Sequence, residues 1–158
     1  MDANADPHVI AADLLPTPFS AAEIRDELRG GALFRIRVEA ADGSVTERIN
    51  RLIDGDDEGI TTESWTADAE PTRRRSTWRE LQEHAAFPAA LARRSIEVLE
   101  HPLGRAELIR YDVADPDGDE VFWFSPAHPG MPVRYEISTA DGVMRTTVVE
   151  ITRDADRG

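Results

Sequence analysis

The stretch from His101 to Ile151 constrains the fold of this chain most, because it holds four strand-like runs separated by turn signals. In these runs apolar residues alternate with polar ones, the period-2 pattern of strands that bury one face. Asp-Gly pairs at positions 117–118 and 141–142 favour tight hairpins. Strands joined by successive short turns pair antiparallel. The stretch therefore predicts a continuous antiparallel meander, with Val149 and Ile151 as the inward pair of its last strand.

The first half of the chain predicts three more strands and two helices. Residues 34–38, 45–53 and 60–67 have strand character, and the Asp-Gly pair at 42–43 joins the first two. Capping-box patterns at Ser20 and Thr77 each predict a helix start.

The helix from Thr77 presents Trp78, Leu81 and Ala85 on one face and is expected to end near Ala86, before a proline. Residues 67–76, which include three consecutive arginines, are interpreted as a loop. Another strand-like run around Ile96 precedes the meander.

These elements predict an α+β fold: a strongly curved antiparallel sheet of about eight strands, an open half-barrel, packed on one main helix. That main helix is the one from Thr77, and the helix from Ser20 is a short addition. Residues 19–152 form a single domain in this prediction. Residues 1–18 form a tail or strap, and residues 153–158 a C-terminal tail.

The amino-acid composition disfavours some classes of binding partner and excludes some types of active-site chemistry. The net charge of −13 disfavours nucleic acid and anionic membranes. There is no cysteine, and all 18 basic residues are arginine, which excludes disulfides, thiolate sites, Schiff-base lysines and phosphate-loop lysines. No run reaches the roughly 20 apolar residues of a membrane helix. We expect a cytoplasmic protein if Met1 is the native start, and an exported one if a signal was trimmed away.

No catalytic, metal or cofactor motif is found. His8, His84, His101 and His128 are scattered, and the acidic runs at 54–58 and 115–120 are explained by turns. We therefore assign no catalytic residue, no metal ligand and no cofactor. A site built from His84 and a carboxylate is kept as a weaker, enzymatic alternative. The arginines Arg73–Arg75 could bind an anionic partner, or only offset the acidic surface.

The order of short motifs resembles a known class of domains. It runs PLG (102–104), strand, DG, FWFSP (122–126), PG, MPVRYEI (131–137), DG, strand. This succession, over residues 93–152, resembles bacterial lipoprotein-localisation domains, the LolA-like carriers and related uncharacterised half-barrel domains. The resemblance implies an unclosed antiparallel barrel wrapped on helices, with an apolar interior for acyl chains.

The aromatic residues are the remaining functional candidates. They either line a pocket or form a filled core, and the free volume between helix and sheet distinguishes the two. We predict a non-enzymatic binding domain for a small apolar ligand, an acyl chain or a protein partner. The alternative is a structural or assembly protein that uses its sheet edges. The oligomeric state is left open. The predicted ligand contacts are Trp65, Trp78, Phe87, Tyr111, Trp123 and Tyr135.

Overall fold

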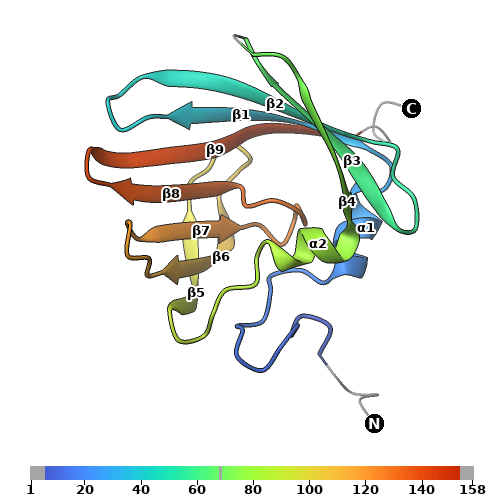
Figure 1. Cartoon of the computed structure of the whole chain (residues 1–158), viewed down its shortest axis with the longest axis horizontal. Helices are drawn as coiled ribbons and strands as arrows, with labels where there is room; N and C mark the ends of the chain where they lie inside the picture. The colour runs from blue at the N-terminus through green and yellow to red at the C-terminus, as the bar shows by residue number, and fades with distance from the viewer. Residues whose placement is uncertain (1–5, 68, 154–158) are drawn as a thin grey trace.

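The computed structural model describes residues 6–67 and 69–153, and within them a single antiparallel sheet dominates the fold (Figure 1). Its nine strands lie in the order β4-β3-β2-β1-β9-β8-β7-β6-β5. The strands are β1 (Ala32–Glu39), β2 (Val45–Ile53), β3 (Gly59–Thr66), β4 (Thr72–Thr77), β5 (Ala92–Leu99), β6 (Ala106–Val113), β7 (Glu120–Phe124), β8 (Arg134–Thr139) and β9 (Gly142–Arg153). The sheet is open, because β4 and β5 lie at opposite ends of this order.

The sheet consists of two meanders joined by the last strand. β1 to β4 form one meander and β5 to β9 the other, and β9 pairs with both β8 and β1. The β1–β9 ladder shifts register between Arg35 and Ile36, so that Val148 rather than Val149 lies opposite Ile36. Val148 is therefore the fully buried residue, and the predicted inward position of Val149 is wrong. The bulge breaks the strict alternation on which that prediction rested.

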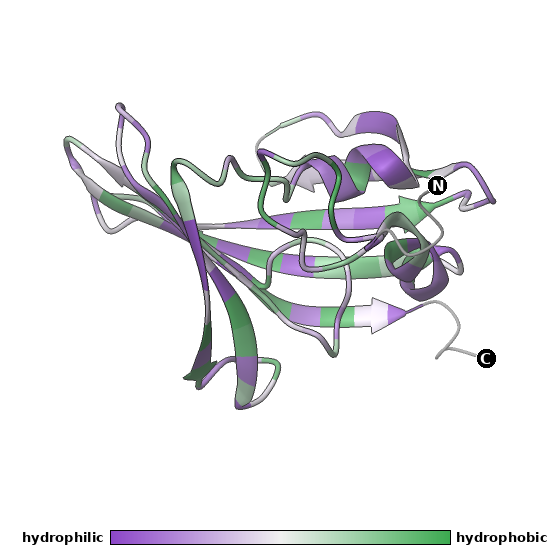
Figure 2. Cartoon of the chain, turned by 90° about the horizontal axis from the view of Figure 1, so that it is seen from below, coloured by the Kyte–Doolittle hydropathy of each residue, from purple (hydrophilic) through white to green (hydrophobic). Residues whose placement is uncertain are grey.

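The core lies on the concave face of the sheet. Along β1, Ala32, Phe34 and Ile36 are buried, while the alternate side chains of Arg35 and Arg37 point to the other face. Figure 2 shows the resulting alternation of hydrophobic and hydrophilic positions along the strands. Residues of both helices and of the N-terminal strap pack against this face in the same cluster.

The two helices are short, and both begin as the sequence predicts. α1 (Ala21–Leu28) follows Ser20, and α2 (Trp78–Glu83) follows Thr77. Each start is a complete capping box, in which the cap hydroxyl accepts the N3 amide hydrogen and the N3 glutamate accepts the cap amide hydrogen. None of the described helices is long and apolar enough to cross a membrane.

The prediction of a sheet packed on one main helix is wrong. α2 has six residues and α1 has eight, so the sheet rather than a helix dominates the fold. The apolar spacing of Trp78, Leu81 and Ala85 predicted a longer helix than forms, because the chain leaves helical geometry after His84 on its way to Pro88.

The predicted loop at 67–76 also contains a strand that sequence reasoning missed. β4 pairs antiparallel with β3, Ser64 opposite Thr72 and Thr62 opposite Arg74. The three consecutive arginines give this strand no alternation of apolar and polar residues, so the sequence pattern does not reveal it. Charged side chains are nevertheless common on edge strands, where they discourage aggregation. This strand raises the number from the predicted eight to nine.

The segment before α1 crosses the open side of the sheet like a strap. Leu14 forms an isolated bridge with Pro88, and the Tyr111 hydroxyl donates to the Pro16 carbonyl at 2.6 Å. Thr17 and Phe19 are buried. The predicted division into tail, domain and C-terminal tail stays a prediction, and residues 1–5 and 154–158 of those tails lie outside the described residues.

Gln82 of α2 holds this strap against both helices. Its side chain is buried, with 2% exposure. Its Nε2 donates to the Pro7 carbonyl at 2.8 Å and to Thr17 Oγ1 at 3.0 Å, and its Oε1 accepts from the Ala21 amide at 3.1 Å. Gln82 therefore joins the strap, the first turn of α1 and α2 through a single amide.

We expect Gln82→Met to lower the free energy of unfolding by about 2 kcal/mol, because it leaves several partly buried polar groups without partners. Urea unfolding followed by tryptophan fluorescence measures this change. Glu83→Met, at the exposed neighbouring position, is the matched control and should shift the midpoint little. Equal midpoints for the two variants would contradict the role of Gln82.

Candidate functional site

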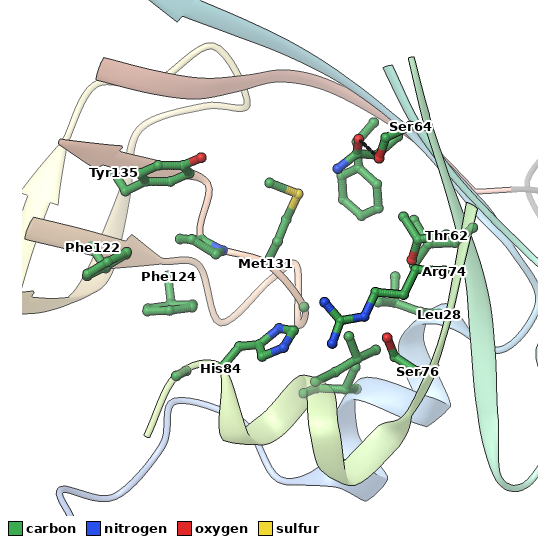
Figure 3. A pocket seen from close by; sticks show the side chains of 18 of the residues that line it. Leu28, Thr62, Ser64, Arg74, Ser76, His84, Phe122, Phe124, Met131 and Tyr135 are labelled. Atoms are coloured by element: carbon green, nitrogen blue, oxygen red, sulfur yellow. Dashed lines mark hydrogen bonds between the residues drawn. The ribbon is translucent and has the colours of Figure 1, made fainter. Parts of the chain in front are cut away.

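A cavity of about 540 Å³ lies between the concave face of the sheet and the two helices (Figure 3). Strands of both meanders, both helices and the β7–β8 loop contribute to its walls. The lining residues are Ile24, Leu28, Phe34, Asn50, Leu52, Thr62, Ser64, Thr72, Arg74, Ser76, Leu81, His84, Ala85, Phe122, Phe124, Gly130, Met131, Pro132 and Tyr135. The space between helix and sheet is thus open rather than fully packed.

The two sides of the cavity differ in polarity. β7, β8 and the loop between them supply an apolar wall of Phe122, Phe124, Met131, Pro132 and Tyr135, which Leu28 and Leu81 of the helices extend. β2, β3 and β4 supply a polar wall of Asn50, Thr62, Ser64, Thr72, Arg74 and Ser76. Figure 3 shows Arg74, Thr62 and Ser64 facing Met131, Phe122 and Tyr135 across the open space. The cavity is therefore amphipathic.

Strand alternation sends Arg74 into the cavity and its two neighbours away from it. Arg73 Nε donates to Glu63 at 3.1 Å, and Arg75 forms an ion pair with Asp56 at 2.7 Å. Arg74 makes no hydrogen bond or ion pair with any of the described residues, and its guanidinium points into the cavity (Figure 3). Arg74 is therefore a free cation on the polar wall.

His84 lies at the helix side of the same cavity, as the C-cap of α2. Its position places an imidazole at the cavity, which the enzymatic alternative requires. That alternative also requires a carboxylate, and no aspartate or glutamate is among the described residues that line the cavity. Among the described lining residues, Arg74 is charged, and His84 and Tyr135 carry the other titratable side chains.

Three of the six predicted ligand contacts gather around the apolar wall. Tyr135 lines the cavity directly. Its ring stacks on Phe122 at 5.8 Å between centroids, Phe122 stacks on Phe87 at 4.9 Å, and Phe87 lies 5.2 Å from Tyr111. Phe87 and Tyr111 thus lie behind the wall, where they fix the ring of Phe122.

The three predicted tryptophan contacts do not line the cavity. Trp78 is buried at the start of α2, where its indole donates to the Asp56 carbonyl at 2.8 Å. Trp65 follows Ser64 on β3, and Ser64 lines the cavity. Because side chains alternate along a strand, Trp65 faces the convex side of the sheet. Trp123 packs on that convex side in a separate cluster with Leu108 and Val133.

Trp123 is held on the convex face by charged neighbours. Its indole donates to Glu97 at 2.7 Å, and the guanidinium carbons of Arg110 and Arg134 lie 5.2 Å and 4.7 Å from its ring centroid. This arrangement is a cation–π sandwich. Trp123 is thus buried on the convex face and Phe124 in the core on the concave face, as the run of four apolar residues in β7 predicts.

Sequence reasoning missed the polar wall of the cavity. Thr62, Ser64 and Ser76 carry no motif, and Arg74 lies in the segment interpreted as a loop. The available signal was the alternation in TRRRST, which places Thr72, Arg74 and Ser76 on one face once the segment is recognised as a strand.

His101, by contrast, is held by backbone groups at both ring nitrogens. His101 donates from Nε2 to the Val133 carbonyl at 2.9 Å and accepts the Leu103 amide hydrogen at Nδ1 at 3.0 Å. Both nitrogens of the neutral ring therefore have hydrogen-bond partners. Burial, together with the charge of Arg134, lowers the pKa of His101. Within residues 6–67 and 69–153, no group of three or more acidic or histidine side chains could hold a metal ion.

Comparison with known proteins shows a likeness of fold. No protein-family model matches the chain. No curated protein matches it either. Among solved structures, crystalline MucB matches with a TM-score of 0.56 and 10% identity over 83% of this chain and 56% of MucB. The Pseudomonas aeruginosa MucA/MucB complex matches with a TM-score of 0.53 and 10% identity, over 85% of this chain and 57% of that one.

The class that these matches define is a fold class, an open antiparallel sheet that resembles part of MucB. The chain spans a little over half of MucB's length. A putative outer membrane lipoprotein-sorting protein domain from Vibrio parahaemolyticus also matches, with 9% identity over 85% of this chain and 91% of that one. Its TM-score is 0.33, so it adds no argument. The likeness to MucB supports the predicted open antiparallel sheet, and the resemblance to lipoprotein-localisation domains stays a prediction.

We expect the stability of the protein to fall as the pH drops below the ordinary histidine pKa of 6.5, in part because of His101. Because the pKa of His101 is lower in the folded state than in the unfolded chain, the unfolded chain binds a proton more readily as the pH falls. The free energy of unfolding therefore decreases toward acid pH. Urea unfolding of the protein and of His101→Gln at pH 8 and pH 5 measures this. The stability advantage of the protein over the variant should shrink at pH 5. An advantage that grows at pH 5 would refute the assignment of a neutral buried ring.

Proposed function

We propose that this protein is a non-enzymatic binding domain that takes a small apolar ligand or acyl chain into the cavity. The observation that carries the proposal is the open volume of about 540 Å³ between helices and sheet. Protein interiors are normally packed to crystal-like density, so an opening of this size in the core region calls for a function. The volume falls within the roughly 300–1,000 Å³ of typical ligand pockets.

The cavity is preformed by rigid elements. Phe122 and Tyr135 belong to paired strands, and Phe87 and Tyr111 support them from behind. Met131 adds an adaptable side chain, since its thioether stem can follow the shape of a ligand. Apolar surface that leaves water here contributes about 25 cal/mol per Å² to binding. Tyr135 is the proposed ligand contact among the six aromatic residues predicted from sequence.

We expect the purified protein to bind the uncharged probe N-phenyl-1-naphthylamine with a gain in fluorescence, because the cavity offers it an apolar environment. Thr62→Phe should weaken this binding at least tenfold, since the larger ring fills the cavity from β3. Fluorescence titration measures both values. Thr152→Phe, on β9 and on the opposite face of the sheet, is the control and should bind the probe like the parent.

Two results would contradict this function. One is the absence of probe binding by the parent protein. The other is equal binding by parent and Thr62→Phe, which would place the probe elsewhere. Native mass spectrometry of the purified protein adds an independent reading, because a ligand retained from the host appears there as an added mass.

A protein partner is the second candidate, and the edge strand β5 favours it. Ile96 and Val98 on β5 are 55% and 48% exposed. The opposite edge, β4, carries three arginines that discourage strand addition, whereas β5 combines an open edge with an apolar surface. MucB, whose fold this chain resembles, is crystallised with the protein MucA, which supports a partner of this general kind.

A second copy of the chain fits β5 as a partner. Antiparallel pairing of two β5 strands about Ser95 would set Arg93 of each copy opposite Glu97 of the other. Such opposite charges specify the register, and the paired strands would extend the sheet across both copies.

We expect light scattering at increasing protein concentration to show a dimer that Ile96→Lys combined with Val98→Lys abolishes. The added charges repel each other across the paired edges and resist burial. Val143→Lys, at a residue 47% exposed and remote from this edge, should leave the dimer intact. A parent protein that stays monomeric at millimolar concentration would rule out self-assembly.

A further inference from the structure

We propose that the cavity selects an anionic amphiphile: a single apolar chain whose carboxylate or phosphate head is bound by Arg74. This inference rests on the proposed function and adds to it the chemical class of the ligand. It follows from the position of Arg74, which has no ion-pair partner among the described residues, in a cavity whose described lining has a polar and an apolar side.

The first observation is the selective orientation of the three arginines. β4 pairs with β3 so that Arg74 lies opposite Thr62, and both residues line the cavity. Arg73 and Arg75 face away and bind Glu63 and Asp56. Arg74 has no such partner among the described residues, although 31 acidic residues are present in the chain. A guanidinium presents a planar fork of donors that matches carboxylate and phosphate groups.

The second observation is the charge of the lining. The protein carries a net charge of −13, but the described lining residues include no carboxylate. Arg74 contributes to the lowered pKa of Glu80, after the backbone and side-chain hydrogen bonds of Thr77. Glu80, however, is engaged in the α2 capping box and does not line the cavity. An anion at Arg74 therefore meets no direct competitor inside the cavity.

The third observation is the polarity of the two walls. Thr62 and Ser76 lie near Arg74 on the polar wall and offer hydroxyl donors to the same head group, whereas the hydroxyl of Thr72 already donates to the Ser64 carbonyl at 3.4 Å. The hydroxyl of Ser64 is already used, since it donates to Asn50 at 2.7 Å. His84 faces this region from α2 (Figure 3). The apolar wall around Phe122 and Met131 lies opposite and takes the chain.

The volume fits one chain. An apolar cavity of about 150 Å³ holds a benzene molecule. The cavity of about 540 Å³ is more than three times larger, enough for a single folded acyl chain. Arg74 would repel a cationic head group. With an uncharged head group, the N–H donors of the Arg74 guanidinium would stay hydrogen-bonded to water.

Four probes with the same chain test this inference: dodecanoate, dodecyl phosphate, dodecanol and dodecyltrimethylammonium. Calorimetry measures each one below its micelle concentration or, for dodecanol, below its solubility limit. Dodecanoate and dodecyl phosphate should bind roughly tenfold or more tightly than dodecanol, as expected for hydrogen bonds to a charged group. Dodecyltrimethylammonium should bind most weakly. Inorganic phosphate that binds as tightly as dodecyl phosphate would overturn the proposal, because the chain would then contribute nothing.

Arg74→Gln is the decisive variant, and Arg73→Gln is its matched control on the outward face. Arg74→Gln should lose the preference for dodecanoate over dodecanol while it keeps the affinity for dodecanol. Arg73→Gln should keep both. Thermal unfolding of each variant verifies that the fold is intact.

The result separates this inference from the proposed function. If dodecanol and dodecanoate bind the parent equally, and Arg74→Gln changes neither, head-group selection is refuted while the binding cavity stands. If none of the four probes binds, the cavity is not a ligand site and both proposals fail.

Discussion

The structure depends on a mismatch between the size of the sheet and the size of the elements that cover it. Nine strands form one continuous concave face, whereas the covering helices have eight and six residues. The strap before α1 helps, through the buried side chain of Phe19 and the hydrogen bond from Tyr111. Because these elements cannot cover the whole face, part of it remains open to water. The cavity is thus a direct result of sparse helical cover, and the strands that line it need no special distortion.

β4 combines a charged sheet edge with one arginine that faces the cavity. Alternation along β4 assigns successive arginines to opposite faces, so the outward pair forms ion pairs with β3 and its preceding loop. Exposed ion pairs of this kind contribute little to stability. They keep the edge charged and, among the described residues, leave Arg74 without an ion-pair partner. The surface acidity of the protein and the positive character of its cavity therefore coexist without conflict.

Sequence alone predicted the local elements better than their assembly. The capping boxes at Ser20 and Thr77 and the hairpin at Asp42-Gly43 were correct, because each depends on neighbouring residues. β4 was missed since its charged residues carry no apolar period, and Val149 was misplaced by a bulge that long-range pairing imposes. The length of α2 was overestimated, because the chain leaves helical geometry after His84 on its way to Pro88. Of the cavity, Tyr135 was predicted, whereas its polar wall was missed because TRRRST was interpreted as a loop, so its strand alternation was not used.

The position of β9 has a consequence for how the protein acquires its fold. β9 contacts β1 across more than one hundred residues of sequence, and it is the strand through which the two meanders become one sheet. During synthesis each meander can form its hairpins as soon as it leaves the ribosome, but β1 keeps an unpaired edge until β9 emerges. Such non-local pairing slows folding and leaves a temporary template for aggregation. The nascent chain therefore passes through a vulnerable intermediate in which the cavity has only one of its walls.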